Sequence, residues 1–170
     1  MSEQLQKRQS QKEQPLSSPS PAGLRAWRLF FESALALSDV LDDELKRDAG
    51  IPVRWYDAMV QLEETTGGLR MNELAERILY SKSSFTRVVD RMEAAGLVRR
   101  VRPENDRRSI FVVLTDEGRN TMEHARRHHR HGIDQHFARH LADSDIKALT
   151  RAFEKVSTHA RPLRPGRIRS

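Results

Sequence analysis

Hydrophobic positions recur at the three- and four-residue spacing of helices through most of this chain. A broad apolar face runs from Leu24 to Lys46, and it is wider than one small domain needs to bury. The same periodicity predicts helices after Pro52 and over residues 71–78, 81–94, 115–140 and 143–156. Two runs rich in Val, Ile, Phe and Leu are typical of strands, namely 97–102 and 109–114. The pattern predicts a mainly α protein with one small β-hairpin.

The helix predicted over residues 81–94 has two very different faces. Its apolar side chains are Phe85, Val88, Val89 and Met92. Its outward positions are Lys82, Ser83, Ser84, Thr86, Arg87, Asp90 and Arg91. Only two residues separate it from the preceding helix, which is the pattern of a helix-turn-helix whose second helix enters the major groove of DNA. Short hydroxyl side chains and arginines can approach phosphates and base edges closely. The alternative is a solvated helix in an ordinary three-helix domain.

The hairpin that follows is crowded with arginines. They are Arg99, Arg100, Arg102, Arg107 and Arg108, and the turn between the strands is 103–106. A two-stranded ribbon with arginines near its tip fits a narrow minor groove, where the negative potential is concentrated. Asp106 should repel phosphate, so we interpret its carboxylate as a support that holds Arg108 in one rotamer through a paired hydrogen bond. A solvated hairpin with an incidental ion pair is the alternative.

Taken together, these residues resemble the MarR family (multiple antibiotic resistance regulators). The pattern Asp106-x-Arg108, followed by Leu114-Thr115 and by Gly118, is similar to the wing signature of that family. The segment 81–100 is similar to its recognition helix and first wing strand, and the likeness runs from about Leu24 to Val156. One departure is Leu79, which stands where many relatives have Gly.

The resemblance implies a winged helix-turn-helix in an obligate homodimer that binds pseudo-palindromic operators in double-stranded DNA. It implies that Arg108 is the minor-groove residue of the wing and that Asp106 supports it. It also implies that the major groove is faced by Ser83, Ser84, Thr86 and Arg87. A transcription repressor is therefore the expected function, and a winged-helix module for protein partners is an alternative.

Composition and charge agree with a nucleic-acid partner. The 170 residues carry a net charge of +6, with no cysteine, so disulfides and thiolate metal sites are excluded. No apolar run is long enough to cross a membrane, and we expect a soluble, cytoplasmic protein. The expected organisation is a disordered arm over 1–21, a dimerisation helix over 22–50, the winged helix-turn-helix over 51–118, dimerisation helices over 119–160 and a basic flexible tail over 161–170. Apolar surplus at both ends of the chain suggests a two-fold interface built from the terminal helices.

The sequence gives fewer indications of how DNA binding is regulated. The resemblance implies a cleft for a small aromatic or anionic effector, and the side chains that could line it are Trp27, Phe31, Trp55 and Tyr56. Aromatic residues at helical spacing are also explained as ordinary core, so both interpretations stay open. No cofactor is expected.

Six histidines between residues 124 and 140 raise a second possibility. His124 with His128, and His136 with His140, have the one-turn spacing that can bind zinc or copper. Neighbouring arginines oppose a cation, and Gly132 is expected to interrupt the helix between the two pairs. A solvated basic helix is the preferred interpretation, and a metal-responsive regulator is the alternative. An enzyme is not expected, because phosphate loops, nucleophile elbows and zinc-protease motifs are absent from the sequence.

Overall fold

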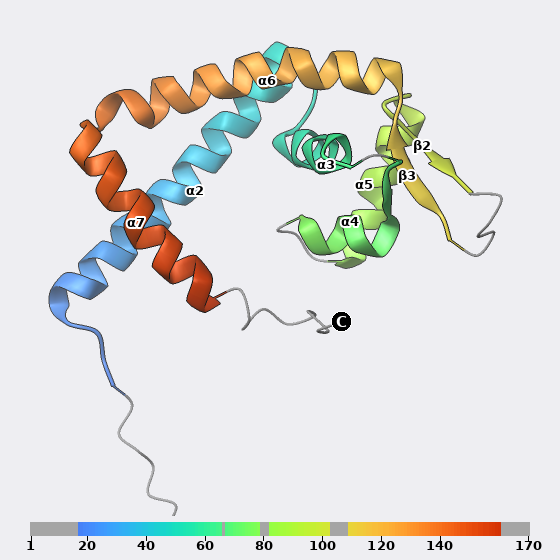
Figure 1. The fold of residues 1–170 in the computed structure, drawn as a ribbon. Coiled ribbons are helices and arrows are strands. Elements are labelled where there is room, and N and C mark those ends of the chain that lie inside the picture. Colours follow the sequence, from blue (N-terminus) through green and yellow to red (C-terminus); the bar gives the residue numbers. More distant parts are fainter. Residues whose placement is uncertain (1–16, 66, 79–81, 103–108, 161–170) are drawn as a thin grey trace, which may run out of the picture. The chain divides into compact units, whose positions relative to one another are not determined.

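The computed structural model describes residues 17–65, 67–78, 82–102 and 109–160, except for the side chains of residues 82–84 (Figure 1). The chain forms two compact units, Met1–Ala36 and Leu37–Ser170. The predicted arm, apart from residues 17–21, and the predicted tail over 161–170 lie outside the described residues. The division into dimerising and DNA-binding segments stays a prediction.

The first helix, α2 (Pro21–Ala49), begins in the first unit and ends in the second. It starts three residues before the predicted position because Pro21 suits the first position of a helix and the Ser20 hydroxyl accepts a hydrogen bond from the Gly23 N–H (3.1 Å). Within the first unit its large apolar side chains are exposed, as expected for a face that the domain itself does not bury; they are Leu24, Trp27, Leu29, Phe30, Phe31 and Leu35.

The second unit contains short helices, a small sheet and two long helices. The helices are α3 (Val53–Glu63), α4 (Met71–Arg77), α5 (Lys82–Ala94), α6 (Asp116–His136), the 3-10 helix η1 (Ala138–His140) and α7 (Asp143–Ala160). The strands are β1 (Leu69–Arg70), β2 (Val98–Val101) and β3 (Phe111–Leu114), and they form an antiparallel sheet in the order β1-β3-β2. The predicted fold class, mainly α with a β-hairpin, is confirmed. The two-residue strand β1 was not predicted, because two residues are too few to show an alternating pattern.

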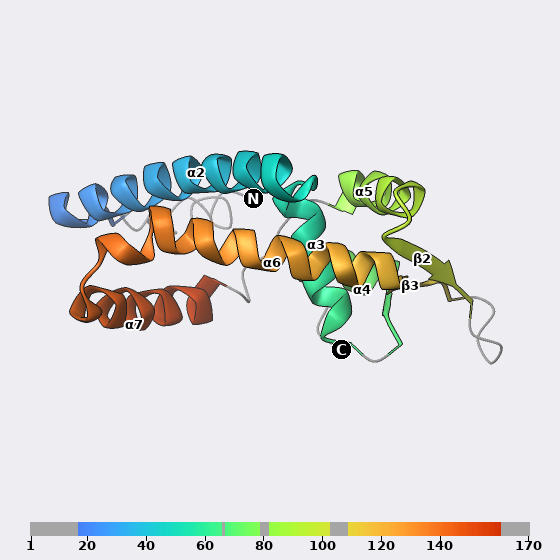
Figure 2. The same cartoon turned by 90° about the horizontal axis from the view of Figure 1, so that it is seen from above.

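A single apolar core joins the end of α2, the helices α3 to α6 and the three strands. α6 starts directly after β3 and passes over α3, where Met122 and Ala125 are fully buried (Figures 1 and 2). Leu74 and Ile78 bury the inner side of the α4 segment, and Phe85 contributes one of the largest buried side chains from α5. The core therefore fixes the helix-turn-helix to the strands on one side and to α6 on the other.

The expectation that Gly132 interrupts α6 is wrong, since the helix continues without a break to His136 (Figure 2). Gly132 is buried against the end of α2. A Cβ atom at this position would lie 2.7 Å from Leu41 Cδ2 and 2.9 Å from Glu44 Oε2. Glycine at this position allows the close approach of two helices. Its low helix propensity does not end α6, which continues through the next turn to His136.

Candidate nucleic-acid interface

Helix α5 presents the two faces predicted from its sequence. Phe85, Val89 and Met92 are buried, and Phe85 is only 2% exposed. On the outer face, the side chains of Thr86, Arg87, Asp90 and Arg91 are exposed. Lys82, Ser83 and Ser84 form the first turn of α5, and their side chains lie outside the described residues. The helix is thus held by one face and leaves a polar, arginine-bearing face for a partner.

The hairpin predicted beside α5 is present. Val98 pairs with Leu114 and Val101 pairs with Phe111, so β2 and β3 are in register along their whole length. The turn with Asp106, Arg107 and Arg108 lies outside the described residues, and the contact proposed between Asp106 and Arg108 stays a prediction. Arg99, within β2, and Arg102, directly after it, are exposed.

Arg100 has a different environment from the other arginines of the hairpin. Its side chain turns back toward α5, where the guanidinium donates hydrogen bonds to Asp90 Oδ1 (2.5 Å) and to Glu93 Oε2. Its backbone N–H donates to Glu93 Oε1 (2.9 Å). Burial alone would lower the pKa of Arg100, but the bonds to Asp90 and Glu93 raise it above its usual value. The sequence places Arg100 among the arginines of the hairpin, but it does not show which side of the strand faces α5.

The end of the hairpin is tied to the end of α5 at Thr115. Its hydroxyl donates to the Gly96 carbonyl (2.6 Å) and accepts from the Gly118 N–H (2.9 Å), so it also caps α6, as predicted. Gly96 has a φ of +75°, the left-handed conformation expected after a helix end. One side chain therefore fixes the end of α5, the end of β3 and the start of α6 at one point.

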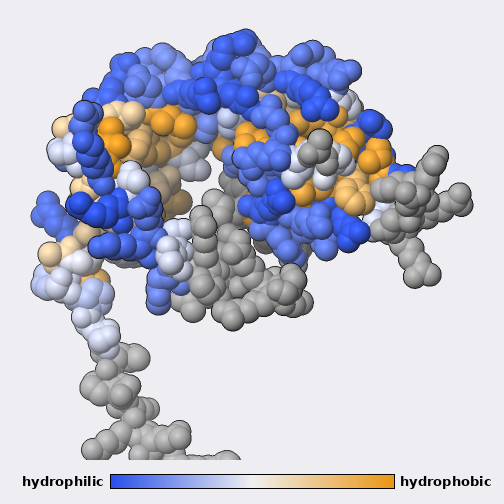
Figure 3. Space-filling view, in the orientation of Figure 1, coloured by the Kyte–Doolittle hydropathy of each residue, from blue (hydrophilic) through white to orange (hydrophobic). Residues whose placement is uncertain are grey.

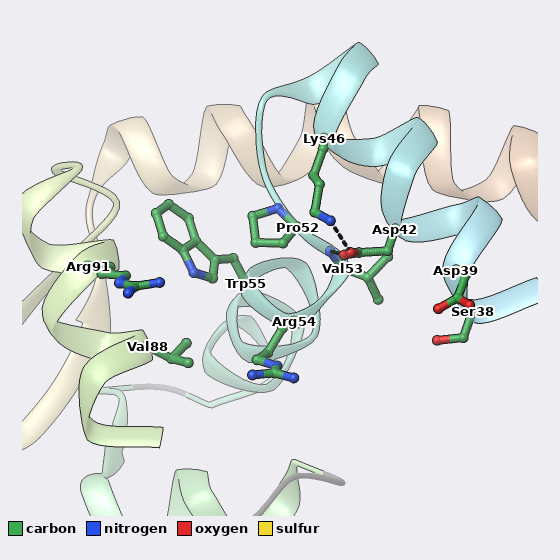
Figure 4. Close-up of a pocket in the computed structure, with 10 residues that line it drawn as sticks. All are labelled: Ser38, Asp39, Asp42, Lys46, Pro52, Val53, Arg54, Trp55, Val88 and Arg91. Carbon is green, nitrogen blue, oxygen red and sulfur yellow. Dashed lines mark hydrogen bonds and ion pairs between the residues drawn. The ribbon is translucent and has the colours of Figure 1, made fainter. Parts of the chain in front are cut away.

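The aromatic residues predicted to line one effector cleft lie in different places. Trp55 lines a hollow of about 460 Å³ between α2, α3 and α5, together with Arg54 and Arg91 (Figure 4). Tyr56 lines a separate hollow of about 350 Å³. Trp27 and Phe31 stack on each other within the first unit, with ring centroids 5.9 Å apart. Within the second unit, Trp55 lies beside Arg91 of α5 and Tyr56 lines the other hollow.

The wall of the larger hollow is rigid on the side of α2. Asp42 Oδ1 accepts a hydrogen bond from the Val53 N–H (2.8 Å) at the start of α3, and Asp42 Oδ2 pairs with Lys46 Nζ (2.5 Å) (Figure 4). The α3 side of the hollow carries the Arg54 guanidinium and the Trp55 indole, α5 contributes Arg91, and Asp39 adds a second carboxylate from α2.

The smaller hollow contains two titratable side chains, His129 and Asp57, that the sequence analysis did not select as candidate site residues. The His129 ring lies against Tyr56, with centroids 4.9 Å apart, and its Nδ1 is buried without a hydrogen-bond partner among the described residues. Burial lowers the pKa of His129, and burial raises the pKa of Asp57 in the same hollow. Both shifts favour the uncharged forms.

We expect the pKa of His129 to make the fold less stable in acid. The folded state disfavours protonated His129, whereas the unfolded state protonates it near pH 6.5, so the unfolded chain binds more protons as the pH falls below about 6.5. Stability is then complete above that pH and is lost below it. Thermal melts between pH 7.5 and 5.5 test this. His129→Phe should weaken the pH dependence, and an unaltered profile in this variant would contradict the assignment.

The histidines between residues 124 and 140 contact different partners and do not converge on one site. His124 and His128 contact each other, with centroids 4.6 Å apart, and His124 Nε2 lies 3.1 Å from the Asp48 carbonyl oxygen. His136 Nε2 lies 2.8 Å from Glu44 Oε1, and His140 Nε2 lies 3.0 Å from the Gln135 carbonyl oxygen. Among the described residues, no group of three or more histidine or acidic side chains is arranged to hold a metal ion. The outer surface of α6 is continuously hydrophilic (Figure 3).

In the part of the chain that the structure describes, no helix has both the length and the apolar character required to cross a bilayer.

Known proteins resemble this chain in sequence and in fold. The model of the MarR family matches residues 49–109. AbsC, a MarR family transcriptional regulator from Streptomyces coelicolor, is 34% identical with a TM-score of 0.77, over 86% of this chain and 99% of AbsC. A second MarR family regulator from that organism, solved in complex with DNA, is 31% identical with a TM-score of 0.78, over 91% of this chain and 96% of its own.

Curated relatives match shorter segments. The transcriptional repressor MdtR of Bacillus subtilis is 42% identical over 52 residues, which are 31% of this chain and 34% of MdtR. The chain spans about half the length of two other curated transcriptional regulators that it matches. The near-complete match to AbsC, the family model over the helix-turn-helix and hairpin, and the arrangement of α4, α5, β2 and β3 agree with one another. This chain belongs to the MarR family of winged helix-turn-helix transcriptional regulators and is not an enzyme.

Proposed function

We propose that this regulator binds double-stranded DNA sequence-specifically, with α5 in the major groove. The observation that carries the proposal is the division of α5 into a fully buried apolar face and an exposed face with Thr86, Arg87 and Arg91. Arginine and short hydroxyl side chains are suited to base edges and phosphates. The relative solved in complex with DNA supports this placement, because the similarity covers almost its whole chain.

We propose that two copies bind together as a homodimer on a pseudo-palindromic operator. α7 has no buried residue and exposes Ile146, Phe153 and Val156, and α2 exposes Trp27 and Phe30 in the first unit. Large apolar side chains on a helix face are stabilised when a second copy covers them. A two-fold dimer would set two α5 helices at about 34–36 Å, the spacing of successive major grooves.

The proposed regulatory outcome is repression. A dimer that occupies an operator blocks access to the promoter, and the name of the relative MdtR describes a repressor. Fluorescence anisotropy against DNA from upstream of the protein's own gene tests the DNA proposal, with a shuffled duplex of equal length as control. We expect a Kd of about 10⁻⁸ M or tighter for the upstream DNA and a value at least about 1,000-fold weaker for the control. Equal affinity for both duplexes would contradict sequence-specific binding.

We propose that the wing reads the adjacent minor groove through Arg108, with Asp106 as its support. Arg108→Ala should weaken operator binding by about 1–3 kcal/mol because a guanidinium in the groove is lost. Asp106→Ala should also weaken binding, although it removes a negative charge from a surface that faces DNA. A model based on net charge alone predicts the opposite sign for Asp106→Ala, so tighter binding in the anisotropy titration would contradict the support role.

We propose that the hollow beside Trp55 accepts a small aromatic anion as effector. An indole wall and the guanidinium groups of Arg54 and Arg91 suit a flat, negatively charged molecule (Figure 4). An effector can change DNA affinity only by binding one conformation of the protein more tightly than another. Benzoate is a suitable probe: it should shift the fluorescence of Trp55 in a Trp27→Phe background, and an unchanged spectrum at saturating concentrations would contradict the site.

A further inference from the structure

The outer face of α5 carries one negative charge between its arginines. Asp90 lies one turn after Arg87 and next to Arg91, and its side chain is 55% exposed. A carboxylate at this position would face the phosphates of a duplex bound by α5, and like charges brought together at an interface are strongly unfavourable. DNA binding through this face therefore requires a means of compensating Asp90.

Arg100 supplies that compensation from the neighbouring strand. Its guanidinium contacts both Asp90 and Glu93, and its side chain is only 26% exposed, so the pairing is less screened by salt than a fully exposed ion pair. Two carboxylates share one planar guanidinium, whose donors are held in a fixed fork, so each carboxylate is bound through a different nitrogen. The backbone N–H of Arg100 holds Glu93 independently of the side chain.

Arg99 provides an internal comparison. It precedes Arg100 on β2, carries the same charge and is exposed. Because successive side chains of a strand point to opposite faces, Arg99 lies on the side of the sheet away from Asp90 and Glu93. The two arginines contribute equally to net charge but differ in their relation to α5.

We propose that Arg100 is a positioning residue for DNA binding: it acts as the internal counter-ion of Asp90 and fixes β2 against the recognition helix, without itself contacting DNA. The inference rests on the proposed function, because it needs α5 to face DNA. Arg100 then determines how much negative charge α5 presents to the groove and at what angle the wing leaves the helix.

The test compares Arg100→Met with the matched control Arg99→Met in operator titrations at several salt concentrations. We expect Arg100→Met to bind about tenfold more weakly, because Asp90 is left unpaired near phosphate. The slope of log Kd against log salt should stay unchanged in Arg100→Met, since a residue that touches no phosphate releases no counterion, whereas a lost phosphate contact lowers the slope by about 0.9. Adding Asp90→Asn to Arg100→Met should restore most of the affinity.

Two further measurements separate binding from folding. Urea denaturation of each variant shows whether Arg100→Met is folded under assay conditions. Asp90→Asn alone changes an exposed side chain, and it should bind within about threefold of wild type, because the charge that it removes is already compensated. A change of about tenfold or more in either direction would show that Asp90 contacts DNA or repels it, and would overturn the counter-ion role.

The outcomes distinguish this inference from the proposed function. Operator binding by wild type with equal affinity for Arg100→Met, or a loss in Arg100→Met that Asp90→Asn does not reverse, would overturn the role of Arg100 and leave sequence-specific binding intact. Failure of wild type to prefer the operator over the shuffled duplex would overturn the proposed function and this inference together.

Discussion

Gly118→Ala is expected to destabilise the protein by about 3 kcal/mol, at the upper end of the range for forcing atoms into a packed core. Gly118 is buried in the first turn of α6, where an alanine Cβ would lie 2.0 Å from the Leu97 carbonyl oxygen. That oxygen belongs to the backbone and already accepts a hydrogen bond from the Thr115 N–H, so it cannot turn aside like a flexible side chain. The helix must shift, and the capping bond from Gly118 to Thr115 is strained with it.

Gly23→Ala is the matched control for this prediction. Gly23 also lies in the first turn of a helix, and its N–H is bonded to a capping hydroxyl. An added Cβ there would meet its nearest neighbour at 3.4 Å, an ordinary contact. Since alanine has the higher helix propensity, Gly23→Ala should leave stability unchanged or raise it slightly. Urea denaturation of the two variants gives the comparison, and equal stability of Gly118→Ala and wild type would show that α6 can move away from the strand without cost.

Phe85→Ala is expected to cost about 4 kcal/mol of folding free energy, within the range for removing a buried aromatic side chain. Phe85 is one of the largest side chains that are almost completely buried, and it lies in the first half of α5. The recognition helix is short, and isolated helices of its length are marginal in water, so its order depends on this buried face. The variant should lose DNA affinity in proportion to the fraction of protein that is unfolded.

Thr86→Ala, at the next position, separates packing from recognition. Thr86 is exposed, so this variant should keep its urea midpoint and report only on contacts with DNA. Phe85→Ala should instead lower the urea midpoint and regain operator affinity in conditions that restore folding, such as lower temperature within the stable range. A Phe85→Ala protein as stable as wild type would contradict the role of this side chain as the anchor of α5.

The elements proposed to bind DNA were predictable because each has a strong local pattern. The stripe of Phe85, Val88, Val89 and Met92 identifies the buried face of α5, and Leu114 with Thr115 and Gly118 identifies the end of the hairpin. The apolar stripe is assigned from helical spacing alone, whereas Gly118 was assigned through the resemblance to the family's wing signature.

Features that depend on orientation between elements were not predictable. Trp55 and Tyr56 are adjacent in the chain, but successive side chains on a helix diverge by about 100°, which places them in different hollows. Gly132 appears in sequence as a helix breaker, and only the approach of Leu41 and Glu44 explains its presence within α6. The pairing of Arg100 with Asp90 joins residues ten positions apart on two different elements, and charge alone does not reveal it.

The junction at Thr115 has a consequence for how the protein can be controlled. α5, β3 and α6 are fastened at Gly96, Thr115 and Gly118, so the helix and the wing cannot swing independently of α6. α6 has 21 residues and is therefore about 30 Å long. Because of this length, a tilt of about 10° displaces its far end by about 5 Å. An effector that tilts α6 would therefore move α5 and the wing together as one rigid body. In the proposed homodimer, such an effector would change the distance between the two DNA-binding units. The structure of each unit would stay the same.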